Sequence, residues 1–160
     1  MRNSIIKNYI GKSILDIITV GSVDIESNPS DICTNNMLLY LEFPEGLLLF
    51  SSIVQMSELG ITQEESIKFD YEIDEDDLYS KMSISNFILR DTISDVCIVK
   101  IIEYLVDGKL KAIEFNLKNN QMLFIDPTYY TGIKLGGEDI KSGFFENHDN
   151  VERIEITQLT

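Results

Sequence analysis

The run "VCIVKIIEYLVDGKLKAIEFNLKNNQMLFIDP", residues 96–127, decides the fold class of this chain. Its three apolar runs are separated by Asp107-Gly108 and by Asn119-Asn120, and the last run ends at Pro127. Asp-Gly favours the type I′ turn of two-residue hairpins, and proline is unfavourable inside a sheet. The stretch therefore predicts a β-meander of three antiparallel strands that ends at Pro127.

The rest of the chain adds further strand candidates. The run "NMLLYLEFPEGLLLFSS", residues 36–52, predicts a hairpin with a Pro-Glu-Gly turn. Apolar runs at 13–20, 131–137 and 151–159 predict a buried strand, a short strand and a closing strand. Residues 21–36 and 138–150 are expected to be loops, and residues 57–66 are a polar stretch between strand candidates.

One further strand is predicted in "IKFDYEIDEDDLYS", residues 67–80, which holds six acids. Apolar residues from Ile67 to Ile73 alternate with charged ones, so a strand here would bury one face and expose acids on the other. Residues 74–83 then resemble the start of a short helix, since acids are favourable near a helix N-terminus. Ile5, Ile6, Tyr9 and Ile10 have helical spacing and are followed by Gly11, which predicts a short N-terminal helix.

With about nine strand candidates and one or two short helices, the fold class is expected to be mainly β. We expect a single domain over residues 1–160, built as an antiparallel twisted sheet, sandwich or partly open barrel. The alternative is an α+β domain in which the N-terminal segment and residues 75–82 form covering helices.

Composition restricts the possible ligands. The net charge is −14, from 27 acids and 13 bases, so phosphates would be repelled and neither nucleic acid nor a membrane is expected as a partner. No run approaches the roughly 18 apolar residues of a membrane-spanning helix. Two cysteines, Cys33 and Cys97, do not predict a disulfide framework, and we expect a cytoplasmic protein.

Signatures of catalysis or metal binding are weak. His148 is the sole histidine, is expected to be solvated in a loop, and has no Ser or Cys motif beside it. An EF-hand loop counted from Asp70 would need Gly and Glu where Glu75 and Lys81 stand. The sequence therefore predicts a protein that is not an enzyme and has no metal and no cofactor. A hydrolase dependent on carboxylates or a divalent metal is kept as an alternative.

The acids are concentrated in two segments. Residues 58–77 carry nine acids and one base, and residues 138–155 carry six acids and two bases. Acids at alternating strand positions lie about 7 Å apart and repel each other, whereas a cationic partner would turn that repulsion into attraction. Phe144 and Phe145 would belong to the second surface. The predicted partner-binding residues are Asp70, Glu72, Asp74, Glu75, Asp76, Asp77, Glu146 and Asp149.

A small, acidic, cysteine-poor, β-rich chain without a catalytic motif resembles the immunity proteins of bacterial contact-dependent inhibition and other polymorphic toxin systems. The resemblance includes "FDYEIDEDD", residues 69–77, and "FIDPTYYTGIKLGG", residues 124–137. It implies that the protein binds and neutralises a cognate toxin domain, expected to be basic and nuclease-like. A different alternative is an adaptor or structural domain that binds its partner by a sheet edge, such as residues 151–159.

Overall fold

The meander forms as expected in the computed structural model, which describes residues 5–53, 58–89, 96–129 and 132–157. Its strands are β7 (Ile98–Val106), β8 (Lys109–Leu117) and β9 (Met122–Tyr129). Asp107 and Gly108 have φ angles of 53° and 78°, as a type I′ turn requires. The expected end at Pro127 is wrong, because β9 continues to Tyr129. Proline is tolerated there because β8 pairs with β9 only up to Ile125 and the register with the next strand is irregular.

Two further strands complete this sheet, and both were predicted. They are β10 (Gly132–Gly136) and β11 (Glu152–Thr157), and the antiparallel order is β10-β9-β8-β7-β11. The acidic loop expected at 138–150 is wrong, because most of it is helix α2 (Glu138–Asn147). Ile140 and Phe144, one helical turn apart, pack on Tyr104 and Phe124 of the sheet, and this tertiary packing outweighs the polar composition.

The other sheet has six strands. They are β1 (Asp16–Asp24), β2 (Asp31–Thr34), β3 (Leu38–Phe43), β4 (Gly46–Ile53), β5 (Glu58–Glu64) and β6 (Leu78–Ser83). The order is β2-β1-β3-β4-β5. Strand β6 lies off this path and pairs with β1 from Ile18 to Val23. The β3–β4 hairpin confirms the prediction for 36–52. The loop expected at 21–36 is wrong in large part, since β1 and β2 occupy much of it. Strand β5 lies in the polar stretch at 57–66.

The predicted acidic strand at 67–73 is also wrong. Residues 65–77 form an irregular segment between β5 and β6. The helix expected at 74–83 is also wrong, because its first part belongs to this segment and the rest is strand β6. The alternation of exposure partly survives, because Ile67, Tyr71 and Ile73 are half-buried while Asp70 and Glu72 are exposed. Ile67 and Tyr71 pack down onto the sheet instead of pairing within it.

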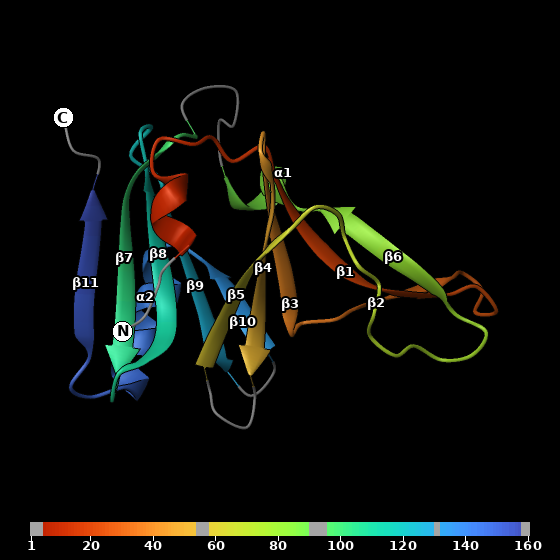
Figure 1. Cartoon of the computed structure of the whole chain (residues 1–160). Coiled ribbons are helices and arrows are strands. Elements are labelled where there is room, and N and C mark those ends of the chain that lie inside the picture. The colour runs from red at the N-terminus through yellow and green to blue at the C-terminus, as the bar shows by residue number, and fades with distance from the viewer. Residues whose placement is uncertain (1–4, 54–57, 90–95, 130–131, 158–160) are drawn as a thin grey trace.

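The core lies between the two sheets, and Figure 1 shows them facing each other. Phe50 of β4 and Phe115 of β8 meet edge to face at 6.0 Å across it. The predicted N-terminal helix is present as a short 3₁₀ helix, η1 (Ile5–Tyr9), and α1 (Ser85–Ile88) is a single turn. The fold is thus mainly β, which confirms the fold class. Among the described segments, no helix has the length and apolar character that crossing a bilayer requires.

Candidate functional site

We call the six-stranded sheet, β1 to β6, the first sheet and the five-stranded sheet, β7 to β11, the second sheet. The first sheet extends beyond the second as a narrow arm. We define the arm as residues 19–34 and 78–83, which comprise the distal part of β1, all of β2 and β6, and the turn from β1 to β2. β2 pairs with one edge of β1 through Gly21 to Asp24, and β6 pairs with the other edge through Ile18 to Val23. Figure 1 shows the arm projecting away from the body of the molecule, with α2 on the opposite side.

Residues 65–77, which we call the strap, lie over one face of the arm. The hydroxyl of Tyr71 donates a hydrogen bond of 2.7 Å to the carbonyl oxygen of Gly21 in β1. The hydroxyl of Tyr79 in β6 donates one of 2.8 Å to the carbonyl oxygen of Tyr71, and the two rings meet edge to face at 5.2 Å. Ile67 and Tyr71 also pack on Ile18 and Val20. The strap therefore has a defined path despite its irregular backbone.

The arm and strap carry a high density of negative charge. Residues 21–34 and 69–80 contain nine acids and no lysine, arginine or histidine: Asp24, Glu26, Asp31, Asp70, Glu72, Asp74, Glu75, Asp76 and Asp77. All but Asp24 and Asp77 are exposed, and those two are half-buried. None of the ion pairs found between described residues involves these nine acids. The two bases of the arm and strap lie just outside these ranges. They are Lys81 of β6 and Lys68 of the strap, which pairs with Glu64 at 3.3 Å.

Some of these acids meet at the tip of the arm. Asp24 is the last residue of β1, and its carboxylate accepts hydrogen bonds from the backbone N–H of Glu26 and the hydroxyl of Ser27 in the β1–β2 turn. These bonds lower the pKa of Asp24. Burial, followed by the negative charges of Asp24, Asp74, Asp76 and Glu26, raises the pKa of Asp77. The turn and the end of the strap are therefore close enough to repel each other.

The structure brings together the predicted residues from Asp74 to Asp77 and places Asp70 and Glu72 farther back on the strap. It does not join Glu146 and Asp149 to them, since both are exposed at the end of α2, away from the arm (Figure 1). The prediction that Phe144 belongs to the second acidic surface is wrong, because this residue is fully buried against the second sheet. Phe145 is 42% exposed.

His148 is not a solvated loop residue either. Its ring is half-buried and stacks on Phe144 at 4.3 Å, and Nδ1 lies 2.9 Å from the carbonyl oxygen of Phe144 at the end of α2. The histidine therefore satisfies one of the carbonyl groups that the last helical turn leaves without an intrahelical partner. These contacts with Phe144 account for the position of His148, and no catalytic role is needed to explain it.

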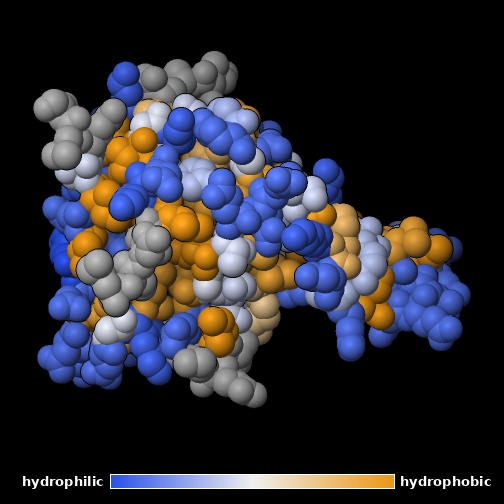
Figure 2. All heavy atoms as spheres, viewed as in Figure 1, coloured by the Kyte–Doolittle hydropathy of each residue, from blue (hydrophilic) through white to orange (hydrophobic). Residues whose placement is uncertain are grey.

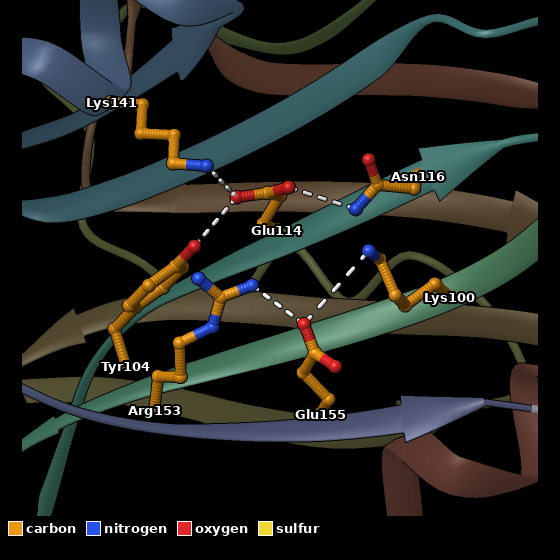
Figure 3. Close-up of polar contacts among 7 residues, drawn as sticks. All are labelled: Lys100, Tyr104, Glu114, Asn116, Lys141, Arg153 and Glu155. Atoms are coloured by element: carbon orange, nitrogen blue, oxygen red, sulfur yellow. Dashed lines mark hydrogen bonds and ion pairs between the residues drawn. The ribbon is translucent and has the colours of Figure 1, made fainter.

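A second concentration of polar side chains lies where α2 meets the second sheet (Figure 3). Glu114 of β8 accepts hydrogen bonds from Tyr104 at 2.7 Å and Asn116 at 2.8 Å, and pairs with Lys141 of α2 at 2.9 Å. Burial alone would raise the pKa of Glu114, but the hydrogen bonds from these three donors outweigh it and lower that pKa. Burial and the bond to Glu114 raise the pKa of Tyr104.

At neutral pH this arrangement leaves Glu114 ionised and Tyr104 protonated. A general acid or base is most effective when its pKa is near the working pH. The pKa of Glu114 is lowered and that of Tyr104 is raised, so both values lie farther from neutral pH than usual. The cluster instead fastens α2 to the sheet. Within the described residues, no group of three or more His, Cys, Asp and Glu side chains is placed to hold a metal ion.

Sequence reasoning missed the contribution of the β1–β2 turn to the acidic tip. Asp24, Glu26 and Asp31 were assigned to a loop, although Val23 and Ile32 on either side of "DIESNPSD" could have indicated a hairpin. It also missed exposed apolar side chains on the arm. Figure 2 shows hydrophobic residues on the arm beside a block of hydrophilic residues at its tip.

No family model, curated protein or solved structure matches this chain.

Proposed function

We propose that this protein is an immunity protein that binds and neutralises a cognate toxin domain in the cytoplasm. The contact is made through the acidic arm and strap. The observation that carries the proposal is the concentration of nine acids, with no base among them in residues 21–34 and 69–80, on the projecting arm and the strap that lies over it. The surface of the toxin domain that it meets is basic, as in a nuclease, because such a domain must approach phosphates.

The acidic tip is unfavourable for the isolated protein. Burial and, after it, the neighbouring acids raise the pKa of Asp77, so both oppose its ionisation. A general need for solubility would be met equally by acids interspersed with lysines over the whole surface. Lysine and arginine side chains of a partner would remove the repulsion on binding and would accelerate the encounter by electrostatic steering.

The proposal is tested with the protein domain encoded immediately upstream, which in a toxin system is the variable C-terminal part of a large secreted protein. This domain is expressed in a bacterial host alone, with the wild-type protein, or with the tip variant Asp74→Lys, Glu75→Lys, Asp76→Lys. We expect growth to stop with the domain alone, to recover with the wild type, and to remain blocked with the tip variant.

The matched control is Glu146→Lys, Asp149→Lys, Glu152→Lys, which makes the same change in net charge on exposed residues around the end of α2. It is expected to protect as well as the wild type. An upstream domain that is harmless alone, or whose toxicity persists with the wild type, contradicts the immunity function. Protection by the tip variant contradicts the role of the arm.

One observation favours a second candidate function, an adaptor that binds by strand addition. β11 is the last strand of its sheet, and among the described strands it pairs with β7 alone. Glu152 to Glu155 are exposed. An open edge offers backbone donors and acceptors to another chain. Binding through this edge would be insensitive to salt, whereas binding through the arm would weaken as salt rises.

A further inference from the structure

A pocket of about 540 Å³ lies on the strap side of the first sheet, where the arm begins. Its apolar lining includes Ile18 of β1, Leu47 of β4, and Ile67 and Phe69 of the strap. Ile18, Leu47 and Ile67 belong to one apolar cluster, so the strap packs on the sheet beside the pocket without filling it. The volume is within the range of roughly 300 to 1,000 Å³ that is usual for ligand pockets.

The pocket is on the same side of the arm as the acids. Side chains along a strand alternate between its two faces, so Asp24 points to the same side as Ile18 and Val20, which face the strap. Asp31 pairs with Asp24 across β1 and β2 and shares that side. The strap, with its own acids, lies over this face. The pocket is therefore part of the acidic surface.

Three charged side chains also line the pocket: Glu42 of β3, Glu65 of the strap and Lys81 of β6. Glu42 pairs with Leu47 across the β3–β4 hairpin and Lys81 pairs with Val20, which places both on the strap side. Within the described part of the chain, none of these three side chains forms a hydrogen bond or an ion pair. Two carboxylates and one ammonium group give the lining one net negative charge, which a single cation would neutralise.

Phe69 gives the pocket an aromatic side. Its ring is 37% exposed and lies 5.4 Å from the ring of Tyr79 and 6.3 Å from that of Tyr71, so neighbouring rings hold it in place. A guanidinium group stacks favourably on an aromatic ring, and its planar set of five donors can bind more than one carboxylate. The methylene stem of arginine packs on apolar surface. An arginine side chain therefore matches the apolar, aromatic and acidic parts of the lining together.

We propose that this pocket receives an arginine side chain of the basic partner. The stem of that arginine contacts Ile18, Leu47 and Phe69, and its guanidinium group binds the carboxylates of Glu42 and Glu65. This inference rests on the proposed function and specifies the anchor point of the contact. Arginine is enriched among the few residues that dominate the affinity of an interface, whereas exposed charges such as the arm acids act mainly on the association rate.

The first test fills the pocket without changing the net charge. Ser66 of the strap lines the pocket and is exposed, so Ser66→Trp places a large side chain in it. The control, Ser142→Trp, adds the same side chain at an exposed position of α2. Binding to the upstream-encoded domain is measured by surface plasmon resonance, and circular dichroism confirms that each variant folds. If Ser66→Trp does not fold, the charge variants below decide alone.

The second test changes the charge of the lining. The pocket variant is Glu42→Gln, Glu65→Gln, and its control is Glu146→Gln, Asp149→Asn, which makes the same change in net charge at the end of α2. Lys81→Met should have the opposite effect and bind about 2- to 5-fold more tightly, because it removes a like charge beside the guanidinium group. Weaker binding of Lys81→Met would mean that the pocket receives an anionic group, which contradicts the inference.

We expect Ser66→Trp to bind at least about 100-fold more weakly, mainly through faster dissociation. The pocket variant should bind at least about 10-fold more weakly, and both controls should bind normally. Wild-type affinity of Ser66→Trp or of the pocket variant overturns this inference, and the proposed function stands if the tip variant still loses binding. Wild-type binding by the tip variant as well contradicts the role of the arm, and failure of the wild type to bind overturns both proposals.

Discussion

Tyr71 and Gly21 are 50 positions apart in the sequence, and the hydroxyl of Tyr71 donates a hydrogen bond of 2.7 Å to the carbonyl oxygen of Gly21. This bond joins the acidic strap to the central strand of the arm. Through it, a segment without regular secondary structure is held over one face, and the opposite face remains uncovered. The two faces of the arm are therefore covered differently.

Replacing Tyr71 by Phe keeps the ring and removes this hydrogen bond. We expect the free energy of unfolding to fall by about 0.5 to 1.5 kcal/mol, the usual net contribution of one hydrogen bond. Urea unfolding measures the loss, and hydrogen exchange should show faster exchange at residues 69–77. Tyr79→Phe removes a more exposed bond and should cost less. Unchanged exchange in the strap would show that the bond does not hold it.

Gly21 is required because β2 approaches β1 closely. A Cβ atom at this position would overlap the carbonyl oxygen of Cys33 and would lie 2.9 Å from Cα of Thr34. Gly21→Ala should therefore displace β2 and reduce the stability by about 1 to 3 kcal/mol, the range found for overpacking. Gly137→Ala is the control, since the atom nearest to its Cβ is 3.9 Å away. Equal stability of the two variants would contradict the close approach.

The acidic tip should make the stability of the protein depend on pH. Because the pKa of Asp77 is raised in the folded protein, the folded state binds the proton more tightly than the unfolded chain. This residue therefore reduces stability above its folded pKa, and the penalty disappears as the pH falls below the unfolded value. Asp77→Asn should raise the melting temperature at pH 7, and the gain should vanish near pH 3 and shrink in high salt.

The control for that comparison is Glu146→Gln, which removes one exposed charge from α2. It should change the melting temperature little at either pH. A melting temperature of Asp77→Asn at or below that of the wild type at pH 7 would mean that the tip acids do not repel one another.

The contact between α2 and the second sheet depends on Lys141. Its removal leaves the buried carboxylate of Glu114 without a charged partner, so Lys141→Ala should reduce stability by about 1 to 3 kcal/mol. Lys109→Ala breaks a more exposed pair, with Glu58, and should cost less than about 1 kcal/mol. Chemical denaturation gives both values. A loss for Lys141→Ala no greater than that for Lys109→Ala would rule out an anchoring role for Glu114.

Because the pKa of Glu114 is lowered, the effect of this residue on stability depends on pH in the opposite sense to that of Asp77. Its contribution to stability is present above the unfolded pKa and is lost as the pH falls through the folded pKa. Lys141→Ala should therefore differ less from the wild type in strong acid than at pH 7. A difference that does not shrink would assign the effect to the packing of the lysine stem.

The fold class could be predicted because the strands of the meander carry long apolar runs and their turns have specific residues. Asp107-Gly108 both defines the type I′ turn and has the positive φ angles it needs. The strap could not be predicted, because its alternating pattern is also produced by an irregular segment that packs every second side chain onto a sheet. Ile67 and Tyr71 do so without any strand partner.

The candidate site was predicted in part. The acids from Asp70 to Asp77 were named from charge density alone, and the structure places them on the strap and tip. Asp24 and Glu26 were missed because their proximity to Asp77 depends on the pairing of β1 with β6, which the sequence does not reveal. Ile32 was missed because an exposed apolar residue cannot be distinguished from a buried one by its identity.

The central claim is that the acidic arm receives a positively charged protein. The most direct measurement is the association rate of the upstream-encoded domain with the wild type and with Asp74→Lys, Glu75→Lys, Asp76→Lys, at salt concentrations from roughly 50 to 500 mM, which span the range of strong to weak screening. The account predicts that the variant associates about 10 to 1,000 times more slowly at low salt and has a flatter salt dependence. An association rate and salt dependence equal to those of the wild type would contradict it.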